Sequence, residues 1–198
     1  MRFYLVTVGE DRPDFFSSKI QDVLSEKYNI KCEVSHALIL VEDAGKWSGI
    51  WESIESGFFG PKDPKKEWKG CHVGDKILLN VQDELGAIRW LRDFVGTPYP
   101  TMQFFLYLPR WIKRVARKLT PKWILKKIFN GKSASWCSES CGHFMRNFCV
   151  GAFEDPKLSI PACDHLDPVN LVPLAKKYSK IQLSDLENSK NPHPWQIL

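Results

Sequence analysis

A cysteine at the expected start of a helix is the strongest candidate for chemistry in this sequence. Cys137 follows a run of small polar residues and Trp136, and an apolar helical pattern begins directly after it. Ser135 suits the N-cap position, and Glu139 lies in the first turn, where acidic residues are favoured. The amide donors and the positive end of the helix dipole stabilise a thiolate there and lower a thiol pKa. We therefore predict that Cys137 is a nucleophile; the structural alternative is a small core residue.

A nucleophilic thiolate needs a base, and His36 is the histidine best placed to supply one. It stands between Ser35 and a run of aliphatic residues that is typical of a buried strand. If the next turn is centred near residues 43–45, Glu52 lies about opposite His36 on the return strand, within side-chain reach. Such a carboxylate holds the imidazole in its useful tautomer. The alternative is a purely structural pair, and Glu55 replaces Glu52 if the register slips.

A zinc site is a competing interpretation, because thiols and imidazoles cluster near the same helix. The cluster comprises Cys137, Cys141, His143 and Cys149, with Cys163 and His165 further along the chain. Its spacing matches no familiar Cys-x-x-Cys or His-x-x-x-His pattern. We therefore predict no metal and no other cofactor. His143 also falls on a different helix face from Cys137, which makes it a poor base for that thiol.

The elements that position these residues are predicted from hydrophobic periodicity and turn signals. Strands are expected over residues 2–8, 32–41, 49–54 and 76–81, and helices over 15–28, 82–95, 137–150 and 169–178. In the helix after residue 82, the predicted inward side chains are Leu85, Ile88, Leu91 and Phe94 or Val95. Residues 156–168 are expected to be irregular. The pattern indicates one mixed domain over residues 1–180 and a loosely held C-terminal tail over 181–198.

Composition restricts the class of protein. The chain has 198 residues, of which 43% are hydrophobic, enough for a substantial core. It contains no apolar run of about 18 residues, as a membrane-spanning helix needs, and no signal-peptide pattern. Six scattered cysteines form no compact disulfide framework. We therefore expect a cytoplasmic protein with reduced thiols.

One segment carries the positive charge of the chain. The formal net charge is +5, yet residues 94–138 contain nine Lys or Arg residues and no Asp or Glu. Within it, the segment Arg110–Lys132 mixes these cations with aromatic and aliphatic residues at helical spacing. We favour a pair of solvated helices over the core, with contact to an anionic membrane surface as the second interpretation. Nucleic acid is the least favoured partner, because the aromatic spacing suits burial more than base stacking.

Four motifs, taken in chain order, resemble the circularly permuted branch of papain-like cysteine peptidases, which is related to NlpC-type amidases and YiiX-like proteins. They are a Ser-His before an aliphatic strand at 35–41, a hydrophobic-Glu strand followed by Gly at 50–57, a helix closing with Gly-x-x-Tyr at 94–99, and an aromatic-Cys-Ser-Glu at 136–139. The order His, Glu, Cys is the permuted one. The resemblance covers roughly residues 1–178, and the chain departs from it in a long basic insertion, residues 100–132.

The resemblance implies an α+β fold in which an antiparallel sheet packs against the helix that bears the nucleophile. Carried over by position, Cys137 is similar to the nucleophile, His36 to the general base and Glu52 to the orienting residue. We further expect substrate-binding roles for Trp136, Ser138, Ser35 and Tyr99.

Three functions follow from this resemblance. The first is a cysteine hydrolase that cleaves an amide bond, for example in a cell-wall peptide, through a thioester acyl-enzyme. The second is a thioesterase or lipid acyltransferase whose basic insertion faces the membrane. The third is a binding module of the same fold in which Cys137 is only packed. The expected partner is accordingly a peptide or an acylated small molecule.

Overall fold

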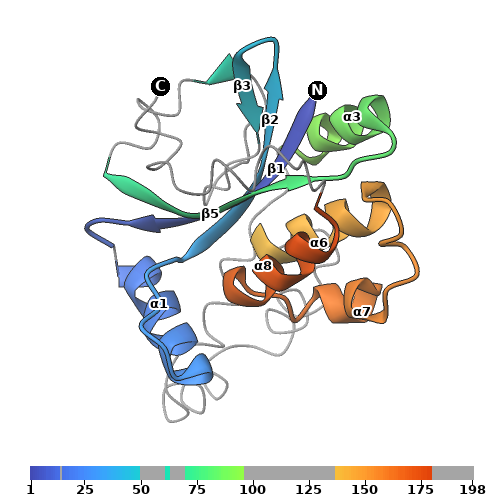
Figure 1. Ribbon diagram of the computed structural model, residues 1–198. Coiled ribbons are helices and arrows are strands. Elements are labelled where there is room, and N and C mark those ends of the chain that lie inside the picture. The colour runs from blue at the N-terminus through green and yellow to red at the C-terminus, as the bar shows by residue number, and fades with distance from the viewer. Residues whose placement is uncertain (14, 50–60, 63–69, 96–136, 180–198) are drawn as a thin grey trace, which may run out of the picture.

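The computed structural model describes residues 1–13, 15–49, 61–62, 70–95 and 137–179 (Figure 1). Its elements are β1 (Arg2–Glu10), α1 (Phe15–Tyr28), β2 (His36–Asp43), β3 (Lys46–Gly49), β4 (Pro61–Lys62), β5 (Cys71–Leu79), α3 (Glu84–Phe94), α6 (Cys137–Phe148), the 3₁₀ helix η2 (Pro156–Leu158), α7 (Ile160–Cys163) and α8 (Pro168–Lys177). These elements confirm the α+β class. Several predicted features lie outside the described residues: most of the strand 49–54 with Glu52, the alternative Glu55, Tyr99, Ser135, Trp136, the insertion 100–132 and the tail 181–198.

In the described part of the chain the sheet has five strands in the order β4-β3-β2-β1-β5, and every neighbouring pair is antiparallel. Strand β1 lies near the middle, paired with β2 on one side and β5 on the other. Its register places Phe3 opposite Val41 and Val8 opposite His36. Consequently the start of β1 and the end of β2 meet at one end of the sheet, and His36 marks the other end.

A tight hairpin joins β2 to β3, as the turn signals predict. Asp43 pairs with Lys46, which leaves a two-residue loop of Ala44 and Gly45. Both loop residues have positive φ, 48° and 76°, the combination that two-residue hairpin loops require. Strand β2 itself begins at His36, later than the predicted residue 32.

Alternation along the strands divides the core into two clusters, one on each face of the sheet. The first lies on what we call the helical face, because it also contains side chains from α3, α6 and α8; its strand members are Phe3, Leu5, Ala37, Ile39, Val41, Ile77 and Leu79. The second lies on the opposite face and comprises Val6, Val8, Leu38, Leu40, Trp47 and Val73. Helices α3, α6 and α8 therefore cover the helical face of the sheet.

Helix α6 lies on the helical face and packs against β2 (Figure 1). The Phe144 ring lies 5.8 Å from that of Phe3, which fixes the second half of the helix at the β1 start. The first half therefore points toward the end of the sheet that His36 marks. The helical spacing of Cys137, Cys141, Phe144 and Phe148 predicts one apolar face: the first three are buried, and Phe148 is partly buried against the same core.

Helix α3 begins after Asp83, whose carboxylate caps it by accepting the Gly86 amide. The predicted inward position of Leu85 is wrong, because its side chain is 64% exposed. The fully buried residues of α3 are Ala87 and Leu91. Leu85 lies about 200° around the helix from Ala87, so burying the Ala87 face turns Leu85 outward.

The C-terminal elements are fixed by two carboxylates. Asp167 caps α8 in a capping box with Asn170, and its other oxygen accepts hydrogen bonds from Lys27 Nζ (2.6 Å) and Tyr28 Oη (2.8 Å) of α1. Asp167 thus connects the first and last described helices. The expected irregular stretch 156–168 instead contains η2 and α7.

The second carboxylate, Asp155, is nearly inaccessible and caps η2 through the Lys157 amide. It also accepts hydrogen bonds from Lys177 Nζ (2.7 Å) and from the Tyr178 hydroxyl. The hydrogen bonds from Lys177 and Tyr178 lower the pKa of Asp155 to about 2. This ionic network holds the end of α8 against the η2 turn.

Candidate functional site

Cys137 is the first residue of α6, and its side chain is only 6% exposed. Since α6 runs along the helical face, its first turn lies toward the end of the sheet where β2 begins. Ser140 and Cys141, in the next turn, are buried as well. The predicted cap residue Ser135 lies outside the described part of the chain, but the start of the helix at Cys137 matches the prediction.

His36 is the first residue of β2 and pairs with Val8 across the ladder. Alternation places it with Val8 and Leu38, on the face opposite the helices. Its Nε2 lies 3.8 Å from Glu10 Oε1. His36 and Cys137 therefore share an end of the sheet, but the pleat assigns His36 to the other face.

Glu10 is the carboxylate that the structure brings to His36, and sequence reasoning missed it. Its side chain also accepts a hydrogen bond of 3.0 Å from Ser17 Oγ in α1. The strand register would have predicted this pair. Val8 lies opposite His36, and Glu10, two residues after Val8 on β1, faces the same side of the sheet. That register was not predictable from either strand alone.

The two serines with predicted binding roles differ in their surroundings. Ser138 Oγ donates a hydrogen bond of 2.7 Å to the Leu166 carbonyl, which ties α6 to the segment before α8. Ser35 is only 1% exposed; its amide donates to Val8 O, while its Oγ has no hydrogen-bond partner among the described residues. An unpaired buried hydroxyl costs about 1–3 kcal/mol, so Ser35 is the stronger candidate for binding a ligand.

A second group of polar side chains lies further along α6. His143 Nε2 is 3.7 Å from Glu139 Oε1, and the two are one turn apart. Asp164, at the end of α7, completes a set whose donor atoms all lie within 4.8 Å of one another. Hydrogen bonds to Cys163 and Glu139 raise the pKa of His143 to about 9. Burial and the neighbouring Glu139 charge raise the pKa of Asp164.

This set differs from the cysteine-based cluster that the sequence suggests. The structure does bring His143 near Cys163, but the partners that gather around it are carboxylates. The spacing Glu139-x-x-x-His143 is visible in the sequence, whereas the approach of Asp164 depends on how α7 packs.

All six cysteines lie in the described part of the chain, and none forms a disulfide. Burial raises the pKa of the Cys149 thiol to about 12 and also raises the pKa values of Cys32 and Cys71. Cys149 can therefore serve as an unreactive reference when the alkylation rates of the thiols are compared.

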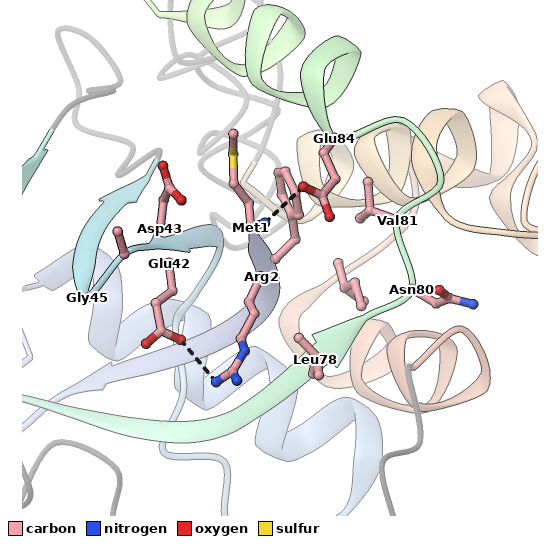
Figure 2. A pocket seen from close by; sticks show the side chains of 12 residues that line it. Met1, Arg2, Glu42, Asp43, Gly45, Leu78, Asn80, Val81 and Glu84 are labelled. Carbon is pink, nitrogen blue, oxygen red and sulfur yellow. Dashed lines mark hydrogen bonds and ion pairs between the residues drawn. The ribbon is translucent and has the colours of Figure 1, made fainter.

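A cavity of about 460 Å³ opens at the far end of the sheet from His36 (Figure 2). Its walls come from the start of β1, the β2–β3 turn, the end of β5 and the start of α3. The charged groups there are paired in part: Arg2 lies 3.8 Å from Glu42, and Glu84 accepts a 2.9 Å hydrogen bond from the amino group of Met1. This cavity is separate from the region around Cys137.

Comparison with known proteins yields no match, either to a family model or to a curated protein or solved structure. Among the described helices, none is long and apolar enough to cross a bilayer.

Proposed function

We propose that the protein is a cysteine hydrolase of permuted papain-like architecture, which cleaves an amide bond with Cys137 as nucleophile and His36 as general base. The observation that supports the proposal most directly is that α6 begins at Cys137 and runs from the end of the sheet where β2 begins at His36. The packing of α6 on an antiparallel sheet is the arrangement that the papain-like resemblance implies.

The proposed hydrolysis uses two groups, the Cys137 thiol at the start of α6 and the His36 imidazole. Amide donors in the first turn of α6 and the helix dipole favour the Cys137 thiolate, whose proton passes to His36. The sulfur attacks the amide carbonyl, and the same amides stabilise the oxyanion. His36 then protonates the departing amine, which leaves a thioester on Cys137. Water, deprotonated by His36, attacks that thioester, and the released acid and the free thiol complete the cycle.

This mechanism requires His36 and Cys137 to meet although the strand pleat places them on different faces of the sheet. The imidazole must therefore reach the sulfur around the start of β2, next to Ser35, and not across the helical face. Glu10 is close enough to orient the ring and takes the role expected of Glu52. The buried Ser35 hydroxyl, directly before His36 in the chain, is the proposed donor for the substrate carbonyl.

The strand pleat favours a second function, a binding module in which Cys137 is a packed core residue. Reactivity of the thiols separates the two. In the hydrolase, iodoacetamide alkylates Cys137 at least tenfold faster than Cys149, whose thiol carries the pKa of about 12, and the rate follows the titration of an imidazole. Peptide mapping by mass spectrometry gives the rate at each cysteine. Equal, slow alkylation of both thiols argues against the hydrolase and favours the binding module.

If Cys137 is a nucleophile, two classes of substrate remain. We favour a peptide amide, and the alternative is a thioester or lipid ester at an anionic membrane surface. Neutralising Lys122, Lys126 and Lys127 abolishes salt-sensitive binding to anionic vesicles if the protein acts on lipid, and leaves peptide hydrolysis unchanged if it does not.

A further inference from the structure

We propose a site for a divalent first-row transition metal ion, with Zn²⁺ as the preferred occupant, formed by Glu139, His143 and Asp164. Their donor atoms, one imidazole nitrogen and two carboxylate oxygens, all lie within 4.8 Å of one another. They come from two separate elements, α6 and the end of α7. The convergence is therefore a property of the folded chain.

Helix α6 supplies two of the ligands. Glu139 and His143 are four residues apart, so their side chains project from the same face of the helix, and the ring nitrogen lies 3.7 Å from the carboxylate oxygen. The Glu139 side chain is 17% exposed and that of His143 is 25% exposed. Both are thus held by the surrounding packing but remain accessible to an ion.

The third ligand is brought in by a close approach of α7 to α6. Gly142 lies between the two α6 ligands, and a Cβ at this position would collide with Leu166 Cδ1 and meet Cys163 Sγ at 3.1 Å. The missing side chain lets the end of α7 lie directly on α6. Asp164, which follows Cys163 and ends α7, is thereby placed beside Glu139 and His143.

The donor set and spacing suit a transition metal. Zinc bonds to nitrogen and oxygen are about 2.0–2.2 Å, so in a tetrahedral site two donors stand about 3.3–3.6 Å apart. The His143 nitrogen and the Glu139 oxygen are 3.7 Å apart, close to this spacing, and the Asp164 carboxylate can close on them by side-chain rotation. One imidazole with two carboxylates is a mixed donor set that suits Zn²⁺ better than Mg²⁺ or Ca²⁺, which prefer oxygen alone. Asp164 is exposed, so water completes the coordination.

Two alternatives lead to different experimental results. In the first, the three side chains form an ion-pair cluster with a protonated His143 and no metal. In the second, metal binds elsewhere through thiolates, since six cysteines are present. A metal at the proposed site ties α6 to α7 and does not depend on the reaction assigned to Cys137.

The test uses the full reduced chain, freed of metal by a chelator and titrated with Co²⁺ and then with Zn²⁺. We expect one equivalent of Co²⁺ with visible d–d bands and without the near-ultraviolet charge-transfer band of a thiolate ligand. Zn²⁺ should displace the Co²⁺. Asp164→Asn and Glu139→Gln should each weaken Zn²⁺ binding at least tenfold, because each removes one of three ligands.

His165→Gln is the matched control, because it removes an exposed imidazole adjacent to Asp164 that is not part of the donor set. This variant should retain the wild-type affinity. The proposal is overturned by a thiolate charge-transfer band, by unchanged affinity in Asp164→Asn and Glu139→Gln, or by no saturable binding in the micromolar range. Circular dichroism verifies that each variant is folded. Alkylation of Cys137, measured in parallel, reports on the hydrolase independently.

Discussion

The imidazole of His36 lies beside the carboxylate of Glu10, with 3.8 Å between Nε2 and Oε1. The two residues stand on neighbouring strands, and α1 contributes the Ser17 hydroxyl to the same carboxylate. Strands β1 and β2 therefore together provide the two residues that we propose as the base and its orienting acid.

This pairing predicts that Glu10 acts through His36. Glu10→Gln removes the charge that orients and stabilises an imidazolium, so the rate of Cys137 alkylation at pH 7 should fall severalfold. His36→Gln should reduce it at least tenfold and remove the imidazole step from the pH profile. His165→Gln is the control and should change neither quantity. A pH profile that is the same in wild type and His36→Gln would show that another group activates the thiol.

Replacing Cys137, the proposed nucleophile, separates an effect on activity from an effect on stability. Cys137→Ala should abolish hydrolysis of any identified substrate, because no other atom at the helix tip can form the thioester. Removing one buried sulfur should reduce the free energy of unfolding by only about 1–2 kcal/mol. Turnover assays and chemical denaturation measure the two effects. Residual turnover at the wild-type rate would exclude Cys137 as the nucleophile.

The lowered pKa of Asp155 predicts that the free energy of unfolding decreases at acidic pH. The folded-state pKa of about 2 lies below the ordinary value of 3.8. The stabilisation is therefore present above about pH 4 and is lost as the pH falls from 3.8 toward 2. Asp155→Asn should unfold about 1–3 kcal/mol more easily at pH 7, because charged hydrogen bonds to Lys177 and Tyr178 are lost.

Urea denaturation at several pH values measures this effect. Between pH 4 and 2 the wild type should lose more stability than Asp155→Asn. Asp93→Asn, at an exposed position on α3, should keep the wild-type pH dependence. Parallel acid curves for wild type and Asp155→Asn would contradict the role given to this carboxylate.

Close packing around Gly9, near the candidate base His36, leaves no room for a larger side chain. A Cβ at this position would collide with the Glu33 carbonyl and meet His72 Nε2 at 2.5 Å. Gly9→Ala should therefore cost about 1–3 kcal/mol in unfolding free energy, since the obstructing carbonyl is backbone. It should also slow Cys137 alkylation, because residues 33–35 lead directly into His36.

Gly45→Asn is a suitable comparison. Gly45 lies in the β2–β3 loop with positive φ and open space around it, and Asn tolerates that conformation. Its unfolding free energy should stay within about 1 kcal/mol of the wild type. If Gly9→Ala proves equally mild, the connection before β2 must be able to move away.

The sequence predicted local features well. The bounds of α1, the start of α6 at Cys137 and the turn at Ala44 and Gly45 depend on periodicity and turn chemistry, which neighbouring residues determine. The outward position of Leu85 was missed, because its helix carries apolar residues on more than one side and tertiary packing selects among them.

Contacts between distant elements could not be predicted in the same way. Pairing of Glu10 with His36 depends on the β1–β2 register, and the approach of Asp164 to His143 depends on the packing of α7 over Gly142. The predicted Glu52 and Tyr99 remain predictions, since both lie outside the described residues.

The hydrogen bonds from Lys27 and Tyr28 to Asp167 span 140 and 139 positions of the chain. During synthesis α1 emerges early, yet its docking partner is made only after most of the protein has left the ribosome. The contacts of α1 with Glu10 and with residues 32–33 can form early, whereas its contact with Asp167 must wait for α8. Closing so long a loop makes this contact a late event in folding, and a nascent chain that stops short of residue 167 leaves Lys27 and Tyr28 without this carboxylate.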